Sequence, residues 1–148
     1  MGPWIEGKNA TINGGAATWS GGALDPKTGI YYVPTGNPSP TYIDKSRPGP
    51  NLYSGSMLAI DARTGYILWA KQLVSPNTKD WDGGLGASLA TISSITTTAS
   101  SPSNNNVKSE RVIVHGTKRG DAYALDAIKG SACWNVLPES PCWNSAQY

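Results

Sequence analysis

The stretch SMLAIDARTGYILW at residues 56–69 decides the fold, because DAYALDAIKGSACW at residues 121–134 repeats its pattern. A weaker third copy, ALDPKTGIYY, covers residues 23–32. The Asp of each copy can cap a tight turn through its side chain, and the Gly can adopt the positive φ that such a turn needs. A hairpin this short cannot bury its apolar face alone, so the recurrence predicts stacked units that share a core. The matching positions are Ala59 and Ala124, Asp61 and Asp126, Ala62 and Ala127, Gly65 and Gly130, and Trp69 and Trp134.

The composition is typical of a single domain, residues 1–148, that is rich in turns and strands. The chain has 17 Gly and 11 Pro, together with 6 Trp and 7 Tyr but no Phe. Its 12 basic and 10 acidic residues are nearly balanced, which argues against a nucleic-acid partner. No apolar run is long enough to cross a membrane, and no signal peptide is recognisable. Because the chain opens on GPWIEG, which resembles the middle of a domain, we expect a fragment without its leader.

Short runs of β-branched, aromatic and small residues, bounded by turn residues, predict strands and very little helix. With one Trp in each unit, they predict an all-β fold, a β-propeller of four-stranded antiparallel blades. The segment 93–109 differs, since 12 of its 17 residues are Ser, Thr or Asn, and we expect a polar insertion loop there. The predicted strands are 18–24, 30–35, 56–61, 66–72, 88–92, 111–115, 122–126 and 132–136.

The cysteines bear on the cellular compartment. Cys133 and Cys142 are the only two, and Pro138 and Pro141 lie between them. This spacing is consistent with a disulfide that clamps the end of the last strand to the following loop, which implies an oxidising compartment. Two free thiols in a cytosolic protein are the alternative. A Cys/His metal site is disfavoured, because His115 is the only His and no CxxC motif occurs.

The repeat, read as AxDxxTGxxxW at residues 59–69, resembles the tryptophan-docking motif of the pyrroloquinoline-quinone (PQQ) dehydrogenases, the quinoprotein alcohol dehydrogenase-like propellers. Further segments are similar to that family, in its order, and together they cover nearly the whole chain. The resemblance implies about two to three blades of an eight-bladed propeller. The further segments are GGAATWSGGALDP at 14–26, PTGNPSP at 34–40, RPGPNLYSGSMLAID at 47–61, KDWDGG at 79–84 and HGTKRGDAYALD at 115–126.

The resemblance assigns roles to two residues of the first half. Trp19 matches the Trp that forms the floor under the quinone ring, although a Trp that packs blades together would look the same. Asn37 matches the amide oxygen that coordinates the family's calcium, although an Asn before Pro also suits a turn. Two positions depart from the family pattern. Ala17 stands where many members have a Thr for a PQQ carboxylate, and Pro50 replaces the Asp of the motif RPGDN.

Two further matches lie in the second half. Asp82 matches the carboxylate that serves as general base and neighbours the metal, with a loop-capping Asp as the alternative. Lys118 matches the cation that hydrogen-bonds the quinone oxygens, with a solvated turn residue as the alternative. Lanthanide-dependent relatives carry a second Asp two positions after this base. Here that position is Gly84, so the resemblance favours Ca²⁺.

The function implied by the resemblance is part of a PQQ-dependent dehydrogenase that oxidises an alcohol, a polyol or a polymeric alcohol with the help of Ca²⁺. Such an enzyme passes electrons to an acceptor such as a cytochrome c or a quinone, and it is periplasmic or extracellular. The alternative is a non-catalytic propeller of the same repeat family, acting as an extracytoplasmic scaffold or binding protein. The presence of Trp19, Asn37, Asp82 and Lys118 together favours the enzyme.

Overall fold

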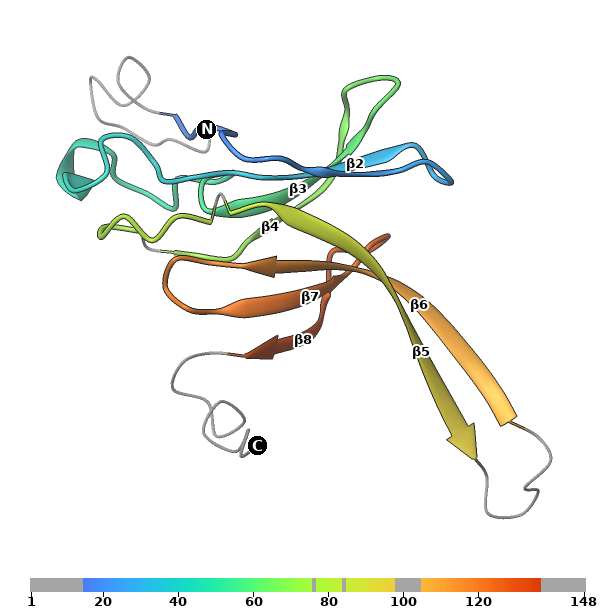
Figure 1. Cartoon of the computed structure of the whole chain (residues 1–148). Coiled ribbons are helices and arrows are strands. Elements are labelled where there is room, and N and C mark those ends of the chain that lie inside the picture. Colours follow the sequence, from blue (N-terminus) through green and yellow to red (C-terminus); the bar gives the residue numbers. More distant parts are fainter. Residues whose placement is uncertain (1–14, 76, 84, 98–104, 137–148) are drawn as a thin grey trace.

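The computed structural model describes residues 15–75, 77–83, 85–97 and 105–136. These residues form two four-stranded antiparallel sheets, ordered β1-β2-β3-β4 and β5-β6-β7-β8, as Figure 1 shows. The arrangement confirms the predicted all-β fold of four-stranded antiparallel units. A short 3₁₀ helix, η1 at Asp44–Ser46, lies in the loop between β2 and β3. The strands are β1 Ala23–Asp25, β2 Ile30–Pro34, β3 Ser56–Asp61, β4 Ile67–Gln72, β5 Ala87–Thr97, β6 Asn105–Gly116, β7 Ala122–Asp126 and β8 Ala132–Val136.

The Asp and the Gly of each repeat form the hairpin turns, as their residue types predict. Asp61 and Asp126 each accept, through Oδ1, hydrogen bonds from the backbone N–H groups two and three residues later, at 2.7 to 3.1 Å. Gly65 and Gly130, with φ of 77° and 68°, donate to the backbone oxygen of the same Asp at 2.8 and 2.9 Å. Asp25 caps the turn of the weaker copy in the same way. The positive φ explains why Gly recurs here.

The two hairpins also share one register. In β3 and β4, Ala59 pairs with Trp69 and a β-bulge follows, and in β7 and β8, Ala124 pairs with Trp134 with a bulge at the same place. A bulge redirects the side chains of its strand, so equal bulges send equivalent residues in equivalent directions. The hairpins predicted at 56–72 and 121–136 are therefore confirmed, while the side chain of Trp134 lies outside the described residues.

Trp69 lies where the first sheet packs on the second. Its indole covers Gly130 so closely that a Cβ there would lie 2.6 Å from Trp69 Cδ2. Trp69 Nε1 donates to the backbone oxygen of Ala127 at 3.1 Å, and the hydroxyl of Tyr32 donates to the same oxygen at 3.0 Å. The buried core between the sheets comprises Tyr32, Met57, Ala59, Leu73, Val74, Ile113, Tyr123, Leu125 and Ala127.

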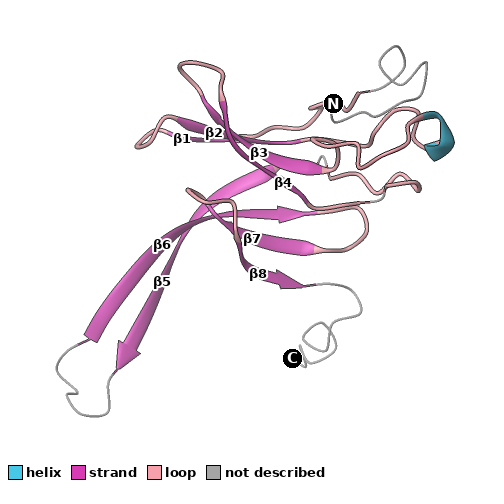
Figure 2. Ribbon diagram, turned by 180° about the vertical axis from the view of Figure 1, so that it is seen from behind, coloured by secondary structure: helices cyan, strands magenta, loops and turns pink. Residues whose placement is uncertain are grey.

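The structure differs from the prediction at the polar segment 93–109. β5 extends to Thr97 and β6 begins at Asn105, and the two pair from Ala87 with His115 to Thr97 with Asn105. The Ile, Thr and Val residues of this segment favour extended backbone even though its composition is polar. The expected loop is therefore strand at both ends, and Figure 2 shows the far end of the long β5–β6 ribbon projecting beyond β7 and β8 of its own sheet.

β1 also begins later than predicted, at Ala23. Gly21 and Gly22 precede it, and a Cβ at Gly22 would lie 2.3 Å from the backbone oxygen of Tyr32, so the chain approaches its neighbour too closely there for a side chain. Among the described residues, no helix is long and apolar enough to cross a membrane.

Candidate functional site

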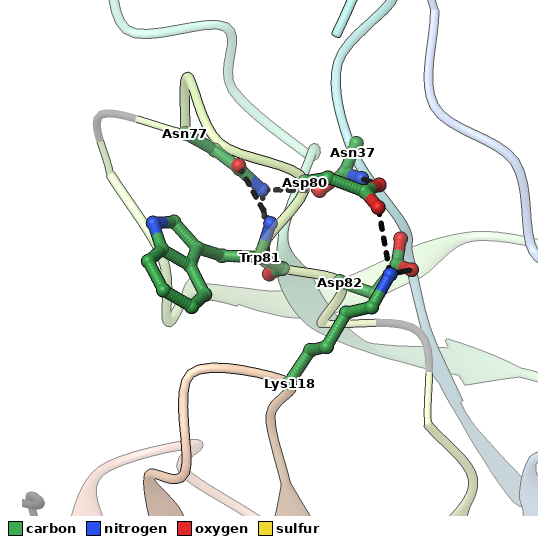
Figure 3. A network of polar contacts seen from close by, with 6 residues as sticks. All are labelled: Asn37, Asn77, Asp80, Trp81, Asp82 and Lys118. Carbon is green, nitrogen blue, oxygen red and sulfur yellow. Dashed lines mark hydrogen bonds and ion pairs between the residues drawn. The ribbon is translucent and has the colours of Figure 1, made fainter.

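The loops that leave β2, β4 and β6 bring polar side chains together beside the two sheets. Asn37 follows the end of β2, Asp80 and Asp82 lie between β4 and β5, and Lys118 follows β6. Figure 3 shows these side chains converging on one another from the separate loops. Positions that are 81 residues apart in the sequence, Asn37 and Lys118, thus belong to one polar cluster.

Lys118 connects the second sheet to the loop before it. Its backbone N–H donates to the backbone oxygen of Asp82 at 3.0 Å. Its Nζ lies 3.1 Å from Asp82 Oδ2 and 2.7 Å from Asp80 Oδ2. The hydrogen bond to Asp80 and then that to Asp82 raise the pKa of Lys118 above its usual 10.5, so the ammonium stays charged at neutral pH. The Asp82 side chain is only 17% exposed, whereas that of Lys118 is 49% exposed and keeps a face toward solvent.

The half-buried amide of Asn37 is held at both of its ends. Its Nδ2 donates to Asp80 Oδ1, and its Oδ1 accepts a hydrogen bond from Asn77 Nδ2 at 2.5 Å. Asn77 in turn accepts, through its own Oδ1, the backbone N–H of Trp81 at 3.2 Å. Asn77 therefore links the Asn37 amide to the residue that precedes Asp82.

Trp19 adjoins the same loop from the N-terminal side. A Cβ at Gly36 would lie 2.9 Å from Trp19 Nε1, and the backbone N–H of Gly36 donates to the backbone oxygen of Ala17 at 2.9 Å. The indole thus rests against the residue before Asn37, and only a glycine allows this approach. Trp19 is nevertheless 55% exposed, so much of its ring surface remains uncovered.

A buried guanidinium fixes the surrounding loops. Arg47 is 3% exposed and donates to the backbone oxygens of Pro40, Thr41 and Asn77 and to Oδ1 of Asn51. A planar group with several donors suits such a set of fixed acceptors. Arg47 thus holds Asn77, and through Asn77 the Asn37 amide, in place.

His115 of β6 contacts the loop that follows Asp82. The imidazole is 2% exposed, and its Nδ1 lies 3.1 Å from the backbone oxygen of Gly86. Burial lowers the pKa of His115 below the usual 6.5, because the low-dielectric interior disfavours the imidazolium. A neutral imidazole therefore supports the loop at neutral pH.

The sequence-predicted site residues fall into two groups. The structure brings Asn37, Asp82 and Lys118 into one network and places Trp19 against its edge. Cys133 is exposed, and Cys142 lies outside the described residues, so their disulfide stays a prediction.

Three residues that join this network, Asp80, Asn77 and Arg47, carry no sequence pattern that marks them as site residues. Arg47 stands in the quoted RPGPN segment, and Asp80 directly precedes the quoted Trp-Asp pair. Their proximity to matched motifs was the only signal available, because polar loop residues follow no periodic pattern.

Comparison with known proteins places this geometry in a family. Residues 2–142 match the β-propeller domain of glucose, ethanol and alcohol dehydrogenases, the PQQ family. The chain belongs to this family.

Among its relatives, the quinoprotein alcohol dehydrogenase PedH of Pseudomonas putida is 46% identical over 70 residues, which is 47% of this chain and 12% of the relative. The quinohemoprotein alcohol dehydrogenase ADH IIB of Pseudomonas putida is 31% identical over 129 residues, which is 86% of this chain and 17% of the relative. The chain thus spans a small part of the length of these quinoproteins.

Solved structures agree with the sequence relatives. The quinohemoprotein alcohol dehydrogenase from Comamonas testosteroni matches with a TM-score of 0.65 and 28% identity, covering 84% of this chain and 17% of that one. A europium-containing methanol dehydrogenase matches with a TM-score of 0.69 and 26% identity, covering 91% of this chain and 21% of that one. The two four-stranded sheets are therefore blades of a quinoprotein β-propeller.

Proposed function

We propose that this chain forms part of a PQQ-dependent dehydrogenase that oxidises an alcohol by hydride transfer to the quinone, with Asp82 as the general base. The observation that supports this most is the meeting of Asn37, Asp82 and Lys118 from separate loops. An amide oxygen, a carboxylate and an ammonium together suit a reaction in which a proton leaves the hydroxyl oxygen of an alcohol and a hydride leaves the carbon that carries this hydroxyl.

The side chains of the site fit the cofactor and the metal in their chemistry. The uncovered ring of Trp19 offers a flat platform, and Lys118 offers a cation for the quinone oxygens. Asn37 Oδ1 and the carboxylate of Asp82 are hard oxygen donors, which Ca²⁺ prefers. When bound, PQQ supplies an electrophilic carbonyl that accepts hydride, and Ca²⁺ polarises that carbonyl. Among the described residues, no group of three or more His, Cys, Asp or Glu could hold a metal ion by itself.

The chain's own residues perform the remaining tasks. Asp82 takes the hydroxyl proton of the alcohol at a carboxylate oxygen, and its limited exposure favours proton transfer from a bound alcohol rather than from bulk water. Asn77 and Arg47 hold the Asn37 amide so that its oxygen keeps one orientation. Gly84, in place of a second Asp, favours Ca²⁺ over a lanthanide.

The cellular location, the electron acceptor and the substrate class of the proposed enzyme are suggested by its relatives. Related proteins include the methanol dehydrogenase (cytochrome c) subunit 1 of Methylobacterium organophilum, whose name contains both an alcohol and a cytochrome c. We therefore propose a periplasmic or extracellular enzyme that passes its electrons to a cytochrome c or a quinone. The substrate class is an alcohol, a polyol or a polymeric alcohol.

The test uses the complete protein reconstituted with PQQ and Ca²⁺, with a redox dye as acceptor. Asp82→Asn keeps the shape of the side chain but removes the base, so we expect kcat to fall by about 100-fold to 10,000-fold while the Kd for PQQ stays within about two-fold. Asp44→Asn, at an exposed acid in η1, makes the same change of charge and should keep wild-type kcat. Chelation of Ca²⁺ should also stop turnover, and added Ca²⁺ should restore it.

The cation is tested separately. Lys118→Ala removes the ammonium from the quinone oxygens, so the Kd for PQQ should rise by about 10-fold, the loss expected for one charge-assisted hydrogen bond. Lys129→Ala, in the turn after β7, is the matched control and should leave the Kd unchanged. No dye-linked alcohol oxidation by the reconstituted wild-type protein, together with no effect of Asp82→Asn, would favour the non-catalytic scaffold instead.

A further inference from the structure

A hollow of about 140 Å³ lies beside the polar cluster, between the loop that joins β2 to β3 and the loop that follows β4. Asn77 lines this hollow, and its Nδ2 also donates to Oδ1 of Asn37 at 2.5 Å. The hollow therefore adjoins the candidate site through a shared side chain, yet the proposed chemistry does not use it. Its volume is enough for several water molecules or for one small organic ligand.

The wall of the hollow contains hydrogen-bonding groups of both kinds. Arg47 is 3% exposed and uses four of its five N–H groups on oxygens of the protein, so one N–H has no acceptor among the described residues. Gln72 donates through Nε2 to three backbone oxygens, while its Oε1 accepts no hydrogen bond within the described part of the chain. The hydroxyl of half-buried Thr78 also has no partner there. The wall thus offers a donor, an acceptor and a hydroxyl that can act as either.

The charges around the hollow favour a neutral ligand. The buried guanidinium of Arg47 makes no ion pair with any described residue, so it disfavours a cation beside it. The carboxylate of Asp44 lies at the exposed rim and disfavours an anion. The two charges act on each other, because burial lowers the pKa of Arg47 and the negative charge of Asp44 opposes this effect. A ligand of either sign therefore meets repulsion from one of them.

We propose that this hollow binds the additional hydroxyl groups of a polyol substrate. Each hydroxyl both donates and accepts, so neighbouring hydroxyls can serve the remaining N–H of Arg47 and the Oε1 of Gln72 together. The rings of Pro38, Pro48 and Pro50 also line the hollow and offer apolar surface to the C–H groups of such a ligand. The consequence for turnover rests on the proposed function, whereas binding in the hollow does not.

Binding is tested in the complete protein without PQQ by saturation-transfer difference NMR. Glycerol is the probe, and 1-propanol, which has the same three-carbon chain with a single hydroxyl, is the comparison. Glycerol should give saturable transfer with a Kd about 5-fold lower than that of 1-propanol, because its extra hydroxyls form hydrogen bonds in the hollow. Glycerate carries a carboxylate in place of one CH₂OH group and should bind more weakly than glycerol, because Asp44 repels it.

Two variants of one residue locate the binding. Thr78→Val removes a hydroxyl of the wall at nearly constant shape, so the Kd for glycerol should rise by about 3-fold to 10-fold. Thr78→Trp fills the hollow and should abolish the saturable transfer. Thr91→Val, at an exposed position of β5, is the matched control and should keep the wild-type Kd. An unchanged Kd in Thr78→Val with saturation retained in Thr78→Trp, or tighter binding of glycerate than of glycerol, would overturn the proposal.

The consequence for the substrate is tested in the protein reconstituted with PQQ and Ca²⁺. Glycerol and 1-propanol present the same primary hydroxyl for oxidation, so the difference between them reports the additional hydroxyls. Thr78→Val should raise the KM for glycerol by about 3-fold to 10-fold, and it should leave the KM for 1-propanol and both kcat values within about two-fold. Thr91→Val should change none of these values.

The outcomes separate the hollow from the proposed function. An equal rise in the KM of both alcohols, or a fall in kcat for both, would show that Thr78 supports the whole site and would overturn the assignment of the hollow to the polyol. If the wild-type protein oxidises neither alcohol, the proposed function fails, and the NMR result still decides whether the hollow binds glycerol.

Discussion

The turns at residues 61–65 and 126–130 have the same local structure but different surroundings. Both have an Asp that accepts two backbone N–H groups and a Gly with positive φ. A Cβ added at Gly130 would meet the indole of Trp69 at 2.6 Å, whereas one added at Gly65 would meet no atom of the described residues within 4 Å. The short motif therefore determines the turn, while a Trp from the preceding sheet determines whether that turn is packed.

The packed turn has a polar component as well as an apolar one. The backbone oxygen of Ala127 accepts hydrogen bonds from both Trp69 Nε1 and the Tyr32 hydroxyl. Its counterpart in the first turn, Ala62, is exposed. Docking between the blades therefore combines burial of the Trp69 indole with hydrogen bonds to the Ala127 oxygen, which packing removes from water.

Removal of the docking ring should have the largest effect. Trp69→Ala takes away a half-buried indole and leaves the Ala127 oxygen with one donor fewer, so the free energy of unfolding should fall by about 2–3 kcal/mol. Urea unfolding followed by far-UV circular dichroism measures this change. Tyr66→Ala, on the same hairpin but 75% exposed, is the control and should change stability by about 0.5 kcal/mol or less. Equal losses for the two variants would contradict the docking role of Trp69.

Substitution of the two turn glycines separates the cost of the turn geometry from the cost of losing the Trp69 contact. Gly65→Ala and Gly130→Ala both place a Cβ at positive φ, which costs about 1 kcal/mol each. Only Gly130→Ala also forces the Trp69 indole to move, which should add about 1 kcal/mol. The difference in urea midpoint between the two variants reports the docking contact alone. If the two variants lose the same stability, the ring does not rest on Gly130 in solution.

The sequence predicted the parts of the fold that local chemistry controls. The Asp and Gly of each copy predicted the turns, and equal positions of Trp69 and Trp134 predicted equal hairpins, both of which the structure contains. The polar segment after β5 has the composition of a loop, whereas its Ile, Thr and Val residues favour extended backbone. Pairing with β6 organises part of it as strand.

The candidate site was predictable only where residues match a known motif. Asn37, Asp82 and Lys118 were found in this way, and their contacts depend on how three loops meet. Asp80 and Asn77 connect these residues through side-chain bonds across 38 to 43 positions of sequence, which no local pattern encodes. Arg47 carries no such signal either, because a buried Arg is recognised by its acceptors, and three of these are backbone oxygens.

The two sheets also differ at the position of His115. By the pairing of the strands, His115 in the second sheet occupies the place that Val33 has in the first. Its folded pKa lies below the usual 6.5, so below this pH the unfolded chain binds a proton that the folded protein does not. The contribution of neutral His115 to the free energy of unfolding is therefore complete above about pH 6.5, and it is lost as the pH falls toward the folded pKa. His115→Val should flatten this dependence when urea unfolding is compared at about pH 7 and about pH 5. An unchanged slope in the variant would show that His115 does not cause it.

Binding of PQQ distinguishes the proposed dehydrogenase most directly from a non-catalytic scaffold, because a scaffold has no reason to bind the quinone. In the complete protein with Ca²⁺, titration with PQQ should quench the tryptophan fluorescence and saturate at one equivalent. Trp19→Ala should raise the Kd by about 10-fold, since the exposed ring would no longer provide a stacking platform. Tyr42→Ala, an exposed aromatic residue outside the polar cluster, should keep the wild-type Kd. Absence of saturable quenching in the wild-type protein, or equal affinity for PQQ in Trp19→Ala, would contradict the assignment of this site to the quinone.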